Sequence, residues 1–438
     1  MISGFYFFAM NLPLLILSRS NDFTVLRFVQ GSRYYLPVLL LSTLACLVGL
    51  AIVTWIHNQH QMDVVVSPGA APPLPQSAAR ISVIVPARNE ARNIRRCVEC
   101  LLSQTYPNFE LIVLDDRSSD ETPAILRAIA AHDARLRVLP GVELPEGWAG
   151  KPHALFQAAQ AARGEWLCFV DADTFAGPQA LGAVFAKAQE TGADLFSIMT
   201  GQEVESFWER VVLPLVFTAL SVGFSPRKVN DPGRTDAIAN GQFIFIRRSV
   251  YDAIGGHAAL KASIVEDRDL AVRVKRAGYR LVIADGRQVA LTRMYTSLPE
   301  LWEGWTKNIF LGLSGSAGLL VLGAFGAFLS LVAALALPLW LLAGLAWWGA
   351  APASGAWLVA AEAALLWGYL VFRRVRVLRE MEIPGWYALT VPLGAGVFAA
   401  MMFASTWKVL SGQGVTWKGR RYGAQSGKTP FFGVPRDR

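Results

Sequence analysis

Two aspartates one residue apart, Asp171 and Asp173, are the side chains whose type and spacing point most directly to chemistry. They follow residues 166–170, an apolar run with the length and composition of a buried strand. Open α/β sheets bind their ligands at the carboxyl ends of such strands. Two carboxylates this close repel each other unless a cation lies between them, and oxygen ligands suit Mg²⁺ or Mn²⁺. The alternative is an Asp-rich turn that closes a strand, because so short a motif recurs by accident.

Other polar stretches stand where a predicted strand ends or a predicted helix begins. Asp115 and Asp116, which precede two serines, could form a turn and a helix N-cap, and Asp267 could cap the helix that it precedes. Lys151 could be a solvated lysine, although the glycines before it and a helix N-terminus after it suit a phosphate group. The candidate residues in these stretches are Pro86, Arg88, Glu90, Asp115, Asp116, Lys151, Glu266 and Asp267.

The elements that position these residues alternate between strand-like and helical patterns. This alternation predicts an α/β fold with a doubly wound, mixed sheet that is mostly parallel. The predicted strands are residues 81–85, 111–114, 136–139, 166–170, 243–247 and 280–283. The predicted helices are residues 90–103, 120–132, 152–163 and 268–277.

Composition places this globular part between membrane segments. Of the 438 residues, 53% are hydrophobic and 17% are charged, which is more apolar than a soluble average, and the apolar runs gather at the two ends. A span is predicted at residues 36–56, whereas 211–224 is too short to cross a bilayer. The predicted regions are an N-terminal membrane region (1–60), a linker (61–79), a catalytic domain (80–297), an interfacial amphipathic helix (298–313), transmembrane helices (314–407) and a basic tail (408–438).

Charge and cysteine usage exclude several classes of protein. The net charge of +8 comes partly from basic clusters beside apolar segments, which suit anionic headgroups or phosphates better than nucleic acid. Four cysteines do not indicate a disulfide scaffold, and we interpret them as reduced. His153 and His257 have no partner in the sequence and are interpreted as ordinary polar residues. The positive-inside rule does not settle topology, because one apolar block separates the clusters at 373–379 and 408–438.

Taken together and in this order, the polar stretches resemble the inverting family-2 glycosyltransferases over residues 80–310. The resemblance implies a nucleotide-sugar-binding sheet of the glycosyltransferase A type, a divalent cation (Mg²⁺ or Mn²⁺) and a role for each residue. The implied nucleotide contacts are Pro86, Arg88 and Glu90, with Asp115 or Asp116 on the base. The implied ligands of the cation and diphosphate are Asp171 and Asp173, with Lys151 nearby, and the implied general base is Asp267, beside Glu266.

One departure from a motif of this family indicates which subgroup of the family the chain resembles. Polysaccharide synthases of this family carry Gln-x-x-Arg-Trp; if Trp305 is aligned with that tryptophan, Leu301 and Gly304 replace the Gln and the Arg. The segment is more similar to that of membrane enzymes that glycosylate carotenoids, ceramide or other hydrophobic acceptors. Asn240, Trp305 and Lys307 are assigned to substrate binding on this resemblance.

The sequence therefore predicts a multi-pass protein of the inner cell membrane, with its catalytic domain facing the cytoplasm. Its predicted reaction moves one sugar from a nucleotide-diphosphate sugar, with a UDP-sugar as the expected donor, to a lipid or isoprenoid acceptor. One base and no covalent nucleophile predict inversion of the anomeric carbon. The alternatives are a polyprenyl-phosphate sugar transferase, a polysaccharide synthase, and a degenerate nucleotide-sugar-binding scaffold that is not an enzyme.

Overall fold

The computed structural model describes most of the globular part of the chain and some of the apolar segments. The described residues are 62–69, 78–223, 225–313 and 356–411, with scattered positions in 43–54, 321–349 and 415–422. They fall into two compact units, one within 60–325 and 397–438 and the other within 1–59 and 326–396. The predicted span at 36–56 and residues 314–355 of the predicted transmembrane region lie largely outside the described residues.

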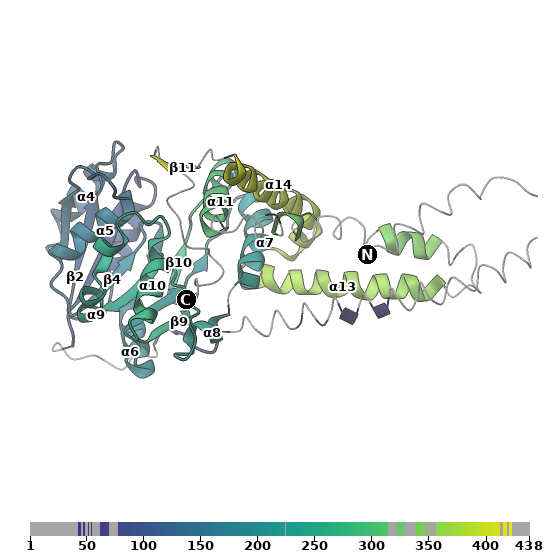
Figure 1. Cartoon of the computed structure of the whole chain (residues 1–438), viewed down its shortest axis with the longest axis horizontal. Helices are drawn as coiled ribbons and strands as arrows, with labels where there is room; N and C mark the ends of the chain where they lie inside the picture. The colour runs from purple at the N-terminus through teal and green to yellow at the C-terminus, as the bar shows by residue number, and fades with distance from the viewer. Residues whose placement is uncertain are drawn as a thin grey trace, which may run out of the picture. The chain divides into compact units, whose positions relative to one another are not determined.

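A seven-stranded sheet in the order β3-β2-β1-β4-β8-β6-β9 forms the centre of the first unit (Figure 1). Strand β8 runs antiparallel to both β4 and β6, and the other neighbouring pairs are parallel, so the predicted α/β class with a mixed sheet is confirmed. The sequence interpretation missed β6. The strands are β1 (Ile81–Ala87), β2 (Phe109–Asp115), β3 (Leu136–Pro140), β4 (Trp166–Val170), β6 (Leu195–Met199), β8 (Phe243–Arg247) and β9 (Leu281–Asp285).

Helices cover both faces of this sheet because successive strand residues point to opposite sides. Val83 and Val85 belong to one hydrophobic core, whereas Ile84 between them belongs to the other. The first core includes α3 (Ile94–Leu102), α4 (Thr122–Ala130) and α6 (Ala180–Thr191). The second includes α5 (Gly150–Ala161), α9 (Arg248–Ala253) and α10 (Glu266–Arg276). The sheet is therefore doubly wound, as predicted.

A second, three-stranded sheet begins directly after Asp173 and was not predicted. Its order is β5-β10-β7, with β5 (Thr174–Ala176), β7 (Gly201–Gln202) and β10 (Ala290–Thr292). The strands are two or three residues long, too short to give a periodic sequence signal. This small sheet fixes the backbone immediately after the two aspartates.

Two apolar helices of the first unit pack against each other, α7 (Phe207–Gly223) and α11 (Leu298–Leu313). On α11, the Trp305 side chain is 5% exposed and meets the ring of Phe217, whereas Trp302 is only partly buried. The two tryptophans therefore have different surroundings, and the interfacial placement of α11 stays a prediction. Two shorter elements are α8 (Pro226–Asn230), which packs against β9, and η2 (Gly256–Leu260), which packs against α5 and α10.

Further helices follow in the C-terminal part, α13 (Ala356–Glu380), η4 (Gly385–Thr390) and α14 (Val391–Leu410). In the described part of the chain, one helical segment, Gly385–Lys408, is long and apolar enough to cross a membrane, with 24 residues and a mean hydropathy of 1.7. Helix α13 lies within the predicted transmembrane region, and its last turns carry a basic stretch that includes Arg373, Arg374 and Arg379. A short antiparallel hairpin, β11 (Val415–Trp417) and β12 (Arg420–Tyr422), lies in the predicted tail.

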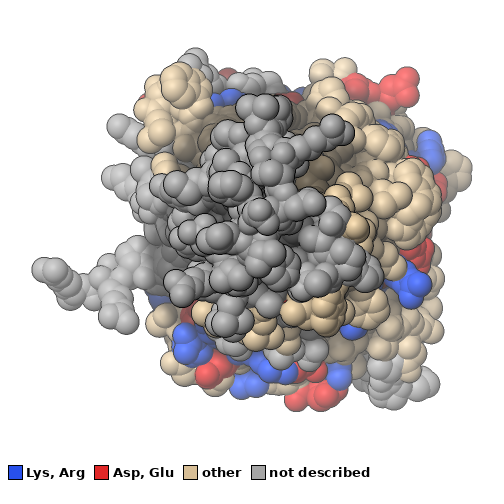
Figure 2. All heavy atoms as spheres, turned by 90° about the vertical axis from the view of Figure 1, so that its right-hand side faces the viewer, with Lys and Arg blue, Asp and Glu red and all other residues tan. Residues whose placement is uncertain are grey.

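Surface charges of opposite sign are mixed on the face seen in Figure 2, where Lys and Arg side chains lie near Asp and Glu side chains. Exposed ion pairs in the described part include Arg227–Asp63 at 2.8 Å and Arg287–Asp285 at 2.7 Å. Exposed pairs of this kind contribute only about 0–1 kcal/mol each. Charged groups that serve a reaction are therefore expected in enclosed positions, not among these exposed pairs.

Candidate active site

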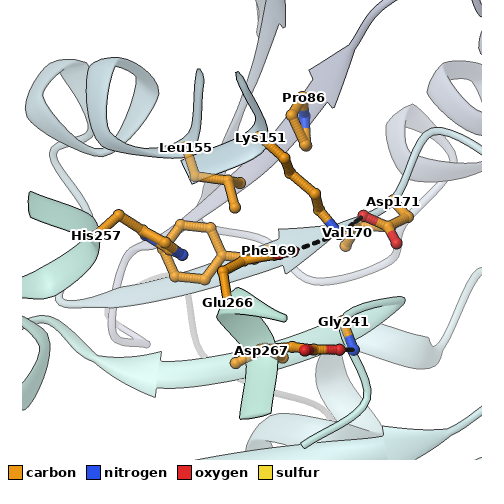
Figure 3. Close-up of a pocket in the computed structure, with 11 residues that line it drawn as sticks. Pro86, Lys151, Leu155, Phe169, Val170, Asp171, Gly241, His257, Glu266 and Asp267 are labelled. Atoms are coloured by element: carbon orange, nitrogen blue, oxygen red, sulfur yellow. Dashed lines mark hydrogen bonds and ion pairs between the residues drawn. The ribbon is translucent and has the colours of Figure 1, made fainter. Parts of the chain in front are cut away.

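One lysine joins two carboxylates from different parts of the chain. The Lys151 Nζ atom lies 2.7 Å from Asp171 Oδ1 and 2.8 Å from Glu266 Oε1 (Figure 3). Asp267, next to Glu266, lines the same pocket. We call Lys151, Asp171, Glu266 and Asp267 the Lys151 cluster. The structure thus brings together four candidate residues that the sequence places as far as 116 positions apart (267 − 151).

Helix N-termini position three members of the Lys151 cluster. Lys151 is the second residue of α5, and Glu266 and Asp267 are the first two residues of α10. The free N–H groups and the positive dipole end of α10 favour carboxylates in its first turn. The N-cap of this helix is Val265, so Asp267 is not the cap residue that its sequence context allowed.

Backbone N–H groups hold both oxygens of the Asp267 carboxylate. Oδ1 accepts a hydrogen bond from the Arg268 N–H at 2.7 Å, and Oδ2 accepts one from the Gly241 N–H at 3.0 Å. Figure 3 shows this second bond between Asp267 and Gly241. Two donors from different segments fix the orientation of the carboxylate.

Burial and neighbouring charges decide the ionisation of the Lys151–Glu266 pair. Glu266 is 5% exposed, and burial alone would raise its pKa, but the charge and hydrogen bond of Lys151 outweigh burial and lower the pKa. Burial likewise acts to lower the pKa of Lys151, yet Asp171 and Glu266 raise it well above its ordinary value. The pair therefore stays ionised, with Lys151 positive and Glu266 negative.

Asp267 has the opposite shift. Burial, and then the negative charge of Glu266, raise the pKa of Asp267 from 3.8 to about 6. A carboxylate with a pKa near neutral is a stronger base than an ordinary aspartate, yet it is still mostly ionised at pH 7. These are the properties that a general base needs.

The cavity beside the Lys151 cluster has a volume of about 10 Å³, close to the room that one water molecule needs. Pro86, at the end of β1, is a fifth predicted residue in its wall. The lining residues are Pro86, Lys151, Leu155, Phe169, Val170, Asp171, Gly241, Ile244, His257, Glu266 and Asp267. In Figure 3, His257 and Asp171 lie on opposite sides of the drawn group, with Glu266 between them.

His257 was missed by the sequence interpretation, which read it as an ordinary polar residue. It is 2% exposed, its Nδ1 lies 2.9 Å from the Tyr251 hydroxyl, and its ring packs edge-on against Phe169. Burial lowers the pKa of His257 to about 4, so the imidazole is neutral at pH 7. The available signal was the preceding glycine pair: Gly256 has a φ of 49°, and a Cβ there would lie 2.5 Å from the Tyr251 ring.

Three predicted nucleotide contacts lie together at the ends of β1 and β2. Arg88 donates from Nη1 to the Asp116 carbonyl at 2.7 Å, and Asp115 Oδ1 accepts from the Ser118 N–H at 3.2 Å. The parallel register pairs Ala87 with Asp115, so the two following loops are neighbours. We call Arg88, Asp115 and Asp116 the β1–β2 edge. They do not line the cavity beside Lys151.

Glu90 and Asp173 also lie outside the cavity wall. The Glu90 N–H donates to the Thr122 hydroxyl at 2.9 Å, and its carbonyl accepts the N–H of Ile94 where α3 begins. The Asp173 carbonyl accepts the N–H of Arg293 at 3.1 Å, which ties the aspartate pair to the small sheet.

The remaining predicted substrate contacts lie on other elements. The Asn240 side chain donates to the Ile198 carbonyl at 2.9 Å, so it is bonded to β6 instead of lining the cavity. Trp305 and Lys307 lie on α11, with the Trp305 ring centred 6.3 Å from that of Tyr295. The structure does not bring these three side chains into the cavity beside Lys151.

Comparison with known proteins identifies the family. The family model described as "Glycosyl transferase family 2" matches residues 82–255. The 4,4'-diaponeurosporenoate glycosyltransferase of Staphylococcus aureus strain MRSA252 is 30% identical over 261 residues, which cover 58% of this chain and 68% of that protein. The chain belongs to glycosyl transferase family 2. The predicted family is confirmed, and the protein is a glycosyltransferase.

Other relatives of this glycosyltransferase differ in how much they share. The 4,4'-diaponeurosporenoate glycosyltransferase of S. aureus strain USA300 is 30% identical over 241 residues, covering 54% of this chain but 62% of that protein. Among solved structures, a mannosyltransferase from Pyrobaculum calidifontis, in complex with GDP-Man and Mn²⁺, has a TM-score of 0.47 at 18% identity. That match covers 85% of this chain and 98% of the mannosyltransferase.

The donor set of this glycosyltransferase suits a cation that is shared with a substrate. Among the residues that the structure describes, no three His, Cys, Asp or Glu side chains gather to hold a metal ion. Asp171 and Asp173 alone would supply two carboxylates. Mg²⁺ is usually bound by one or two carboxylates together with substrate phosphates. The residues therefore fit a cation that binds jointly with a diphosphate.

Proposed function

We propose that this glycosyltransferase moves a single sugar, with inversion, from a nucleotide-diphosphate sugar to a hydroxyl or carboxyl group of a lipid, isoprenoid or carotenoid acceptor. A UDP-sugar is the expected donor. The observation that carries the proposal is the Lys151 cluster, because it holds a cationic group and a carboxylate of near-neutral pKa in one pocket.

The leaving-group half of the reaction needs positive charge. As the bond between the anomeric carbon and the diphosphate oxygen breaks, the diphosphate keeps the electron pair and gains negative charge. Lys151, from the first turn of α5, is the positive side chain that borders the pocket. A divalent cation on Asp171 and Asp173, when bound, neutralises further charge on the diphosphate.

The acceptor half needs a base. As the acceptor oxygen attacks the anomeric carbon, Asp267 takes the hydroxyl proton, and a single displacement inverts the configuration. The N–H groups of Gly241 and Arg268 hold the carboxylate in one orientation during this step. An acceptor carboxylate has already lost its proton near pH 7, so it would depend on Asp267 much less.

A hydrophobic acceptor is supported by the relative's name, 4,4'-diaponeurosporenoate glycosyltransferase, and by the apolar segment Gly385–Lys408. The proposal includes multi-pass placement in the inner cell membrane. It also includes a catalytic domain on the cytoplasmic side of that membrane.

The test uses the purified full chain with labelled UDP-sugars and lipid extract. We expect a glycolipid product that disappears when EDTA removes divalent cations. We expect Asp267→Asn to lower kcat by about 10²–10⁴-fold on a hydroxyl acceptor, as loss of a general base does. The matched control is Asp269→Asn, two residues along α10, whose carboxylate bonds Ser263 at 2.7 Å and should leave kcat unchanged. Full activity of Asp267→Asn on such an acceptor would contradict the proposed base.

A further inference from the structure

Three residues between α8 and β8, which we call the bridge segment (240–242), contact both halves of the proposed site. We infer that the bridge segment is a positioning element that sets the general base Asp267 relative to the leaving-group carboxylate Asp171. The inference rests on the proposed function. It gives Asn240 a different role from the substrate contact predicted from the sequence.

The middle residue of the bridge segment serves the base. The Gly241 N–H donates to Asp267 Oδ2 at 3.0 Å. A Cβ atom on Gly241 would lie 2.9 Å from that oxygen and 3.3 Å from Lys151 Nζ. Glycine therefore lets the backbone approach the base and the lysine, and a methyl group would push the carboxylate away from its donor.

The last residue of the bridge segment serves the leaving-group side. The Gln242 carbonyl accepts the backbone N–H of Asp171 at 3.3 Å, where the chain leaves β4. The Asp171 carbonyl in turn accepts the N–H of Thr174 at 3.0 Å. Neighbouring peptide groups thus bond to both Asp171 and Asp267, so any shift of the segment moves the two carboxylates relative to each other.

Asn240 anchors the bridge segment to the end of β6. Its backbone N–H donates to the Ser197 hydroxyl at 2.8 Å, and Ser197 is fully buried. Its side-chain Nδ2 donates to the Ile198 carbonyl at 2.9 Å and to Gln242 Oε1 at 3.1 Å. Both hydrogens of the Asn240 side-chain amide are therefore engaged in bonds that hold the bridge segment in place.

A chain of buried threonine hydroxyls connects the Gln242 side chain of the bridge segment to Thr174. Thr200 donates to Gln242 Oε1, Thr292 donates to Thr200 at 3.1 Å, and Thr174 lies 3.1 Å from Thr292. Thr174 follows the aspartate pair directly. The contacts therefore form a closed loop that runs from Asp171 through Gln242 and the hydroxyls back to the segment that carries Asp171. Buried polar networks whose members are all bonded make a region rigid. Rigidity matters here because displacing a reacting group by about 1 Å can lower a rate about 10²-fold.

The first test is Asn240→Asp, which keeps the shape of the side chain but removes the Nδ2 donor. We expect kcat to fall by about 10–10²-fold, the size of a small misplacement, with the donor KM and UDP affinity unchanged. The low-pH side of the pH–rate profile should also move to higher pH, because a weaker hydrogen bond to ionised Asp267 raises its pKa.

The matched control is Asn230→Asp. The Asn230 Nδ2 donates to the Ile283 carbonyl at 2.9 Å, the same kind of side-chain bond to a strand, but next to β9 and away from the bridge segment. This variant should lose comparable stability in a thermal unfolding scan and keep the wild-type kcat and pH profile. A second variant, Gly241→Ala, should lower kcat without raising the donor KM.

Each other outcome overturns something specific. No transfer by the wild-type chain with any donor overturns the proposed function and this inference with it. An active wild type, with Asn240→Asp and Asn230→Asp losing activity only in proportion to folded protein, overturns the inference alone. A raised donor KM with unchanged kcat in Asn240→Asp makes Asn240 a substrate contact and also overturns the inference.

Discussion

The β1–β2 edge and the Lys151 cluster are built in different ways. In the β1–β2 edge, geometry comes from the backbone: Arg88 bonds a carbonyl, and Asn89 and Arg117 adopt φ angles of 53° and 56°, uncommon for residues other than glycine. In the Lys151 cluster, geometry comes from charges that neutralise one another at 2.7 and 2.8 Å. Under the proposed function, we predict that changes at the edge alter how well the donor binds, whereas changes in the cluster alter the chemical step.

After Asp267→Asn, the largest effect is expected from Lys151→Met. This change leaves Glu266, 5% exposed, without the cation that keeps it ionised, and it removes the positive charge that the proposed mechanism places beside the diphosphate. We expect kcat to fall about 10²–10³-fold, as when one charge-stabilising donor is lost. Stability should fall by about 1–3 kcal/mol, the scale for a charged hydrogen bond. Steady-state kinetics and denaturant unfolding measure the two effects.

Lys187→Met is the matched control for that experiment. Lys187 pairs with Glu190 at 2.7 Å on α6, and Glu190 is 66% exposed. Such a pair contributes about 0–1 kcal/mol, and it lies outside the cavity wall. Equal losses of kcat in the two methionine variants would mean that the ion pairs of the Lys151 cluster have no special role in the reaction.

The next effect is on pH dependence. Because the pKa of Asp267 is raised to about 6, kcat/KM on a hydroxyl acceptor should fall as the pH drops through about 6. Well below that pH the fall should approach about tenfold per pH unit, since only the ionised carboxylate accepts a proton. The residual activity of Asp267→Asn should lack this dependence. If the variant keeps the same low-pH fall, another group is responsible.

The raised pKa of Asp267 affects stability in the opposite direction from activity: activity rises with pH, whereas this contribution to stability falls with pH. The folded state binds the Asp267 proton more tightly than the unfolded chain does. This carboxyl group therefore contributes stability below its ordinary pKa of 3.8, and the contribution is lost as the pH rises through about 6. Asp267→Asn should remove that loss, so the variant should gain stability relative to the wild type above pH 6. Denaturant unfolding at several pH values measures it.

A smaller effect is expected at the β1–β2 edge. Arg88→Ala removes the bond to the Asp116 carbonyl at 2.7 Å, which is one of the contacts that hold the loop after β2. We expect the donor KM to rise about tenfold, the scale of a hydrogen bond from a charged group, with kcat little changed. Arg95→Ala is the control, because Arg95 lies on α3 in an exposed pair with Glu99. If Arg88→Ala lowers kcat and leaves the donor KM unchanged, the β1–β2 edge and the Lys151 cluster do not differ in the way proposed.

The β1–β2 edge was more predictable from sequence than the Lys151 cluster. Its residues follow two apolar strands directly, and neighbouring parallel strands end at the same edge of a sheet. Asp115 and Arg88 could therefore be placed close together without long-range information. The small sheet after Asp173 was missed, because strands of two or three residues carry no period.

The Lys151 cluster depends on contacts that sequence distance hides. Asp171 and Asp267 were recognised as chemical groups, but nothing local shows that Lys151 bonds Asp171 and Glu266 together. Gly241 and His257 were given no role in the site for the same reason. Gly241 acts through a backbone N–H, which every residue except proline has, and His257 acts through burial, which comes from the packing of η2 against α5.

The smallest effect on activity is expected from Tyr251→Phe, which tests whether His257 needs its partner. The Tyr251 oxygen accepts the His257 backbone N–H at 3.1 Å and lies 2.9 Å from Nδ1, and the residue is 3% exposed. Removing it leaves two buried groups unbonded and should cost about 1–3 kcal/mol of stability. Activity should fall only a few-fold, about 1 kcal/mol in the barrier, because Tyr251 acts through His257 and does not line the cavity itself.

Tyr106→Phe supplies the comparison, since Tyr106 is also 3% exposed and its hydroxyl donates to the Ala79 carbonyl at 2.6 Å. Both variants lose a buried phenol, so thermal unfolding should show similar losses of stability. Only Tyr251→Phe should change kcat, because His257, the partner of Tyr251, lines the cavity, whereas Ala79, the partner of Tyr106, does not. Equal kcat values for both variants, at equal folded fractions, would show that the orientation of the neutral imidazole has no part in the reaction. The cavity wall would then act on the substrate through its charges alone.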